Sequence, residues 1–173
     1  MHIIESAFGK YHPAGELGDA DIIIGHSFGT STHRESPNGA IARYIQAIEQ
    51  GQPVLVDRTL ADAFPRSAQP DVVVEGALSN TMGSVGGSWG ILVEAKRYMD
   101  EEQLAHPLMV AQAFHIGRVA MQAAKAGMEN IIIPEDLPRG FDAESEQRWT
   151  RSLGLWVPRE VIGSLALKHQ GRL

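Results

Sequence analysis

Short apolar runs alternate with segments of helical spacing along most of the chain. Five runs are bounded by acids, glycine or proline, as is typical of strands covered on both faces; they span residues 19–25, 53–56, 71–75, 108–113 and 130–133. Between them, apolar residues recur at spacings of three and four, which predicts helices. This alternation indicates an α/β protein: a three-layer sandwich with about five mostly parallel strands and helices on both faces.

The expected helices begin and end at residue types that favour helix ends. The clearest has Ser36 as its cap, starts at Pro37 and stops at Gly51, because a serine hydroxyl satisfies a free N–H group and proline suits the first turn. The others are expected at 60–64, from Ser79-Asn80-Thr81 onward, at 116–126, after a cap at Asp142, and from Pro158 to Gly171. No linker or repeat separates these elements, so residues 1–173 are expected to form a single domain.

Composition and charge narrow the classes of partner and compartment. The chain has no cysteine, which excludes disulfides and thiol nucleophiles and fits a reducing compartment. A net charge of −6 without a lysine or arginine cluster predicts neither nucleic acid nor a membrane surface as partner. No apolar run approaches the roughly 20 residues of a membrane span, and the start lacks a signal-peptide pattern. We therefore expect a cytoplasmic protein whose partners are small ligands or proteins, with an oligomeric state that does not follow from the sequence.

The predicted turn between a strand and a helix near residue 115 carries two groups that suit an anion. His115 and Arg118 are three residues apart, so both side chains project from one face of the helix's first turn. The free N–H groups of that turn favour negative charge, and parallel sheets bind ligands beyond the carboxyl ends of their strands. This predicts an anion site with His115 as general acid or base, because a pKa near 6.5 suits that role. The alternative is a solvated Arg118 and a capping or core His115.

The loop after the first predicted strand has two functional interpretations. Gly25-His26-Ser27-Phe28-Gly29 matches the G-x-S-x-G turn that presents a nucleophilic serine, with Asp136 and His169 as the later acid and histidine. That turn needs a helix directly after the serine, whereas residues 30–36 are typical of a loop. The other interpretation is a cradle in which backbone N–H groups and small hydroxyl side chains surround an anion; its members are Gly25, His26, Ser27, Gly29, Thr30 and Ser31.

Other ligand motifs are absent or not diagnostic. The chain lacks the G-x-G-x-x-G dinucleotide fingerprint and the G-K-[ST] phosphate loop. His26, His33 and His115 have no spacing diagnostic of a metal site, so no metal is expected. Asp57, at the end of the second predicted strand, either accepts hydrogen bonds from a ribose or is an ordinary solvated or salt-bridged acid.

The combination of motifs resembles the YdcF, SanA and ElyC family, which has a Rossmann-like sheet. The likeness runs from about Asp21 to the C-terminus and includes Ser79-Asn80-Thr81 before a long helix, Phe114-His115-Ile116-Gly117-Arg118 after a strand, Gly127, and Arg159-Glu160 in the closing helix. The family typically shows S-x-N-T followed by an E-N pair, and T-S-x-Y-H-M-x-R-A. The resemblance implies that Asn80 or Thr81, His115 and Arg118 are pocket residues.

Two departures from the family pattern bear on the ligand. Gly83 and Ser84 stand where the E-N pair is expected, and His26-Ser27-Phe28 replaces a glycine-rich stretch. The resemblance therefore does not imply a ligand or reaction that uses the missing glutamate. SanA and ElyC look membrane-anchored, whereas YdcF is soluble and has been linked to S-adenosylmethionine binding. With no evident anchor segment, this chain is more similar to YdcF.

Together these patterns predict a YdcF-like, Rossmann-like protein that binds a small anionic molecule at the carboxyl ends of the strands. The molecule is expected to be nucleotide-like, similar to S-adenosylmethionine, or phosphorylated. The cofactor is not identified, and S-adenosylmethionine and a nucleotide are the two candidates. The 25–31 loop and Arg118 would hold the anion, while Asn80 and Thr81 orient the ligand. Hydrolase or transferase chemistry is compatible with this site. Two alternatives are a non-catalytic ligand sensor and a small serine hydrolase with Ser27 as nucleophile.

Overall fold

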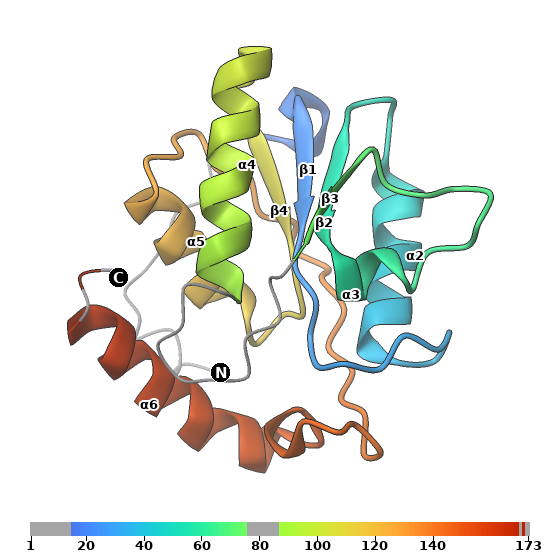
Figure 1. Ribbon diagram of the computed structural model, residues 1–173, viewed down its shortest axis with the longest axis vertical. Helices are drawn as coiled ribbons and strands as arrows, with labels where there is room; N and C mark the ends of the chain where they lie inside the picture. The colour runs from blue at the N-terminus through green and yellow to red at the C-terminus, as the bar shows by residue number, and fades with distance from the viewer. Residues whose placement is uncertain (1–14, 76–86, 170, 172–173) are drawn as a thin grey trace.

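Four parallel strands form the centre of the computed structural model, which describes residues 15–75, 87–169 and 171 (Figure 1). They are β1 (Ile22–Gly25), β2 (Val54–Asp57), β3 (Val72–Val74) and β4 (Pro107–Val110). Their order across the sheet is β3-β2-β1-β4, and every pairing is parallel. The predicted α/β class is confirmed, and the layout is Rossmann-like, but the sheet has four strands rather than about five.

The segment expected as a fifth strand, at 130–133, makes only a single parallel bridge. Ile132 pairs with Leu108 of β4. Asn130 just before it has a positive φ of 48°, and Pro134 just after Ile133 has no N–H group to continue a ladder. The apolar run is therefore cut short at both ends, although it still packs against the edge of β4.

The helices match the expected positions in part. They are α2 (Pro37–Ile48), α3 (Arg58–Ala61), α4 (Ser88–Glu102), α5 (Ile116–Lys125) and α6 (Leu153–His169), with the 3₁₀ turns η1 (Leu17–Asp19) and η2 (Arg148–Thr150). The cap predicted for α2 is confirmed, because Ser36 Oγ accepts a 3.1 Å hydrogen bond from the Gly39 N–H group. α3 begins two residues before the predicted 60–64 because Asp57 caps it by accepting from the Leu60 N–H group.

Three helix boundaries differ from the predicted ones. Asp142 does not cap a helix: its side chain accepts from the Glu144 N–H group in a turn, and the next element is the 3₁₀ turn η2. α6 begins at Leu153, so Pro158 lies inside the helix instead of starting it. α4 begins at Ser88 after Gly87, whose φ of 78° suits glycine, while the expected opening at Ser79-Asn80-Thr81 lies outside the described residues.

Helices cover both faces of the sheet, as the pattern predicted. Side chains of a strand alternate between faces, so Ile22 and Ile24 pack with α4 and α5, whereas Ile23 packs with α2 and α3. α6 lies along the lower left of the molecule in Figure 1, and its Trp156 belongs to the core cluster that also contains α2 and α3 residues. Among the helices that the structure describes, none combines the length and apolar character needed to cross a lipid bilayer.

Candidate functional site

The carboxyl ends of β1 and β4 lie side by side, and the chain leaves them toward opposite faces of the sheet. Gly25 at the end of β1 pairs with Val110 at the end of β4. β1 leads to α2 on one face, and β4 leads to α5 on the other. Open α/β sheets bind ligands at such a divergence point. His26 directly follows β1 and His115 precedes α5, so both predicted residues lie here.

His115 is a neutral hydrogen-bond donor in this structure. Its Nδ1 atom lies 3.1 Å from an Arg118 nitrogen, and its Nε2 atom lies 3.2 Å from Ser88 Oγ. A guanidinium can only donate, so Nδ1 accepts and the neutral imidazole carries its proton on Nε2. Burial, followed by the charge of Arg118, lowers the pKa of His115 well below 6.5. The pKa near 6.5 expected for an acid or base at this position is therefore wrong.

Arg118 is held by a carboxylate from α6. Its Nε atom donates a 2.7 Å hydrogen bond to Glu160 Oε1, and both side chains are largely buried, at 15% and 4% exposure. Burial raises the pKa of Glu160, and the Arg118 guanidinium opposes that rise. Arg159 is a second cation here, and its guanidinium lies over the Trp149 ring. Burial, followed by repulsion from Arg118, lowers the pKa of Arg159. Two guanidiniums and one carboxylate leave one net positive charge beside neutral His115.

His26 is fully buried and unusual in its polar contacts. Burial, followed by the charge of Arg118, lowers its pKa to about 3, so the ring is neutral at pH 7. Among the described residues neither of its ring nitrogens has a hydrogen-bond partner. Repulsion between the protonated forms of His26 and His115 also lowers the pKa of His115, so the two imidazoles lie within electrostatic reach of each other. An unsatisfied imidazole next to a cation is thus a specific feature of this edge.

Two aromatic rings pack against His115. Trp156 of α6 meets the imidazole edge to face, with ring centroids 5.4 Å apart, and Phe28 lies 6.3 Å away. Phe28 and Trp156 also contact each other at 4.7 Å. These rings exclude water from the imidazole and explain why desolvation is the largest cause of its lowered pKa.

The predicted anion cradle is already occupied by protein groups. The backbone N–H groups of His26, Ser27 and Phe28 donate respectively to the Val110 carbonyl, the Asp57 carboxylate and Asn38 Oδ1. These three N–H groups therefore have no capacity left for an external anion. Packing explains why glycine occupies position 25, because a Cβ atom there would lie under 3 Å from three core side chains.

Gly29 and Ser31 of the same loop are also engaged within the protein. Gly29 has a φ of 81° and lies against Thr150, and the Ser31 hydroxyl hydrogen-bonds Asp142. The Thr30 hydroxyl is buried without a hydrogen-bond partner among the described residues. Contacts within the protein therefore hold this loop in place. Asp57 contributes by accepting hydrogen bonds from Ser27, and burial raises the pKa of the Asp57 carboxyl.

The described residues do not form the Ser27, Asp136 and His169 triad of a serine hydrolase. α2 begins at Pro37, ten residues after Ser27, so no helix directly follows the serine. Asp136 accepts a hydrogen bond from Tyr44 rather than from a histidine, and His169 is the last residue of α6. The carboxylate next to Ser27 is Asp57, which accepts from both the backbone and the hydroxyl of the serine.

The structure adds three residues to the site and leaves two predicted ones untested. Ser88, Trp156 and Glu160 contact His115 or Arg118, but none of them was predicted as a site residue. The only sequence signal for Glu160 was the Arg159-Glu160 pair of the family resemblance. Asn80 and Thr81 lie outside the described residues.

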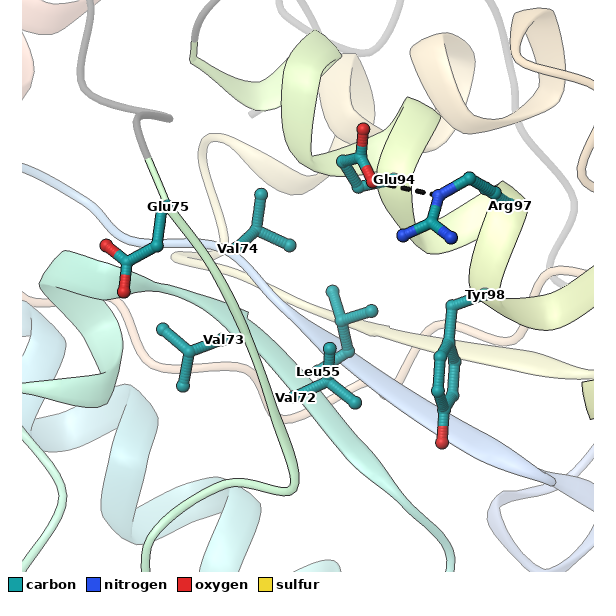
Figure 2. Close-up of a pocket in the computed structure, with 8 residues that line it drawn as sticks. All are labelled: Leu55, Val72, Val73, Val74, Glu75, Glu94, Arg97 and Tyr98. Atoms are coloured by element: carbon teal, nitrogen blue, oxygen red, sulfur yellow. Dashed lines mark hydrogen bonds and ion pairs between the residues drawn. The ribbon is translucent and has the colours of Figure 1, made fainter. Parts of the chain in front are cut away.

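A separate hollow lies at the opposite edge of the sheet, between β3 and α4. Its volume is about 230 Å³, and Figure 2 shows its apolar floor of strand residues and a rim that includes Glu94 and Arg97. Glu94 and Arg97 pair with each other, and Glu75 at the other side of the hollow pairs with Arg58. Each of these charged side chains is thus paired with an opposite charge, whereas the site at the carboxyl ends of β1 and β4 has a net positive charge.

Comparisons of the chain with protein family models, with curated proteins and with solved structures find no match.

Proposed function

We propose that this chain is a cytoplasmic, YdcF-like protein that binds a small anionic molecule where β1 and β4 end. The binding group is a phosphate or carboxylate, as carried by a nucleotide, a phosphorylated metabolite or S-adenosylmethionine. Arg118 and Arg159 supply the positive charge, and His26 and His115 supply neutral N–H donors. The absence of cysteine supports the compartment, and the motif resemblance supports the family.

The observation that carries this proposal is the unpartnered His26 ring. A buried polar group without a hydrogen bond costs about 1–3 kcal/mol. The described part of the chain contains such a group at the divergence point of the sheet, within electrostatic reach of the Arg118 guanidinium and the His115 imidazole. A ligand oxygen that accepts from His26 would remove this cost, which supports binding at this position over a purely structural role.

Any chemistry at this site would use His115 as a neutral donor. Its Nε2–H group points to Ser88 Oγ, so Nε2 cannot take a proton from that hydroxyl. A neutral imidazole donor stabilises an oxygen that gains negative charge, such as a polarised carbonyl or phosphoryl oxygen. A ligand oxygen that replaces Ser88 Oγ would occupy the same donor.

A thermal-shift screen tests the proposal. The wild-type protein is heated with nucleotides, sugar phosphates and S-adenosylmethionine, and a ligand at 100 times its Kd adds about 2.7 kcal/mol, or about 5–10 °C in Tm for a chain of this size. His26→Phe keeps a ring in the core but removes both nitrogens, so it should lose most of the ligand-induced shift. His33→Gln, at an exposed histidine, is the matched control and should retain the shift.

Two results would contradict the proposal. One is that none of these compounds raises the Tm of the wild-type protein. The other is that His26→Phe, with its own melting transition intact, keeps the full ligand-induced shift.

A specific observation also favours the second candidate, a non-catalytic sensor. Both imidazoles are neutral and His115 already donates to Ser88, so neither is placed as a base beside a nucleophile in the described residues. A compound that raises the Tm but is recovered unchanged after prolonged incubation supports the sensor. Conversion of the bound compound, lost in His115→Gln, supports an enzyme.

A further inference from the structure

α6 is apolar on two opposite sides. Its inner side buries Trp156 against the site, together with the carboxylate of Glu160. Its outer side exposes four large apolar side chains, between 41% and 64% accessible: Leu155, Val161, Ile162 and Leu165. Outside α6, only Leu17 and Val93 are comparable in the described residues. Large apolar side chains gathered on an exposed helix side often mark an interaction surface, so another surface is expected to cover the outer side.

The exposed residues form one continuous stripe. Leu155, Pro158, Ile162 and Leu165 follow each other at helical spacings of three and four, and all are exposed. The charged residues within this part of the helix do not interrupt it, because Glu160 is buried on Arg118 and Arg159 is stacked on Trp149. The stripe therefore runs over about three turns without an exposed acid.

The stripe has basic residues at both ends. Arg148 and Arg151 precede it and Lys168 follows it, and all three are exposed. The chain has 21 acidic residues, yet the only one between residues 148 and 169 is the buried Glu160. Although the whole chain has a net charge of −6, residues 148–169 form a segment that is basic and apolar.

We propose that the outer side of α6 docks on an anionic lipid surface. The apolar stripe would lie among the upper parts of the acyl chains, while Arg148, Arg151 and Lys168 contact the headgroups. α6 lies at the periphery of the molecule in Figure 1. Its inner side carries Trp156 and Glu160, so the docked helix would hold the candidate site close to the lipid surface.

The charges favour lipid over a second copy of the chain. Packing α6 on itself in the antiparallel direction places Lys168 against the Arg148 and Arg151 end, and parallel packing places each basic end against its equal. Both arrangements bring like charges together, whereas anionic headgroups complement both ends. This proposal departs from the expectation, drawn from the overall net charge, that a membrane surface is not a partner.

Flotation with lipid vesicles tests the docking surface. The full chain should bind vesicles of phosphatidylcholine with phosphatidylglycerol and not vesicles of phosphatidylcholine alone, and added salt should weaken binding. Ile162→Glu and Leu165→Glu should each abolish flotation. Val93→Glu, at an apolar residue on α4 that is 45% exposed, is the matched control and should bind like the wild type. Arg148→Gln with Lys168→Gln should lower the partition coefficient about 30-fold.

Several outcomes would overturn this proposal. They are absence of wild-type binding, equal binding to both kinds of vesicle, and unchanged binding by Ile162→Glu. A fourth is a dimer in sedimentation experiments that Ile162→Glu converts to monomer, because that result assigns the face to a second copy. The substituted side chains are exposed, and unchanged melting transitions would confirm that each variant folds.

Discussion

Arg118 Nε donates a 2.7 Å hydrogen bond to Glu160 Oε1, which joins the first turn of α5 to α6 across 42 residues of chain. The same guanidinium contacts His115 Nδ1 at 3.1 Å. One ion pair therefore holds α6 beside the edge of the sheet and also determines which nitrogen of His115 carries the proton.

Breaking this pair from one side should destabilise the protein strongly. Arg118→Met leaves Glu160 buried without a partner, which is expected to cost about 3–5 kcal/mol, and the double variant Arg118→Met with Glu160→Leu should recover much of that loss. Urea denaturation of the wild type, both single variants and the double variant measures the coupling. Arg97→Gln, in an exposed pair with Glu101, is the control and should change stability little. Additive single effects at Arg118 and Glu160 would show that the pair is not coupled.

Stability should depend on pH through His26. Its pKa is about 3 in the folded protein, because of burial and Arg118, against 6.5 as its ordinary value. The unfolded chain therefore binds more protons between these values, so the free energy of unfolding falls as pH falls from about 6.5 toward 3. The contribution is about 1.4 kcal/mol for each pH unit. His115 acts in the same direction, whereas the raised pKa values of Asp57 and Glu160 act in the opposite direction.

The contribution of His26 is measured as a difference between proteins. Urea denaturation of the wild type and His26→Phe is compared at several pH values between about 7 and 4. The variant should gain stability relative to the wild type as the pH falls, because it has no imidazole to protonate on unfolding. His33→Gln should follow the wild-type curve. Parallel curves for the wild type and His26→Phe would contradict the low pKa of His26.

Anion affinity should be independent of pH near neutrality. Both imidazoles are neutral there and the positive charge comes from guanidiniums, which do not titrate in this range. Calorimetric titration with sulfate, whose own charge is constant, should give the same Kd between about pH 6 and 8. Affinity that rises steeply toward pH 6 would instead show that an imidazolium binds the anion.

Gly25 should be intolerant of a methyl group for packing reasons. A Cβ atom would lie 2.8 Å from Ile45 Cδ1 and 2.9 Å from Leu60 and Val56 carbons. Gly25→Ala is therefore expected to lose about 1–3 kcal/mol in urea denaturation. Gly117→Ala is the control, because its Cβ meets open space in α5, and it should be neutral or stabilising by up to about 1 kcal/mol. Equal stability of both variants would contradict the packing explanation.

The sequence by itself determined the elements whose signals are local. Ser36 and Pro37 start α2 as predicted, because the cap bonds a group three residues away. Apolar runs placed four strands of a parallel sheet, and the spacing of His115 and Arg118 predicted that they share a face, which their 3.1 Å contact shows. Such signals act within a turn or a strand and need no knowledge of distant residues.

Only the tertiary structure decided the polar partners and charge states at the site. Glu160 and Trp156 reach His115 or Arg118 from α6, and Ser88 from α4. The loop N–H groups that sequence assigned to an anion are taken by Asp57 and Asn38. A pKa or a free donor depends on which distant groups fill the space around it, and periodicity along a chain does not encode that neighbourhood.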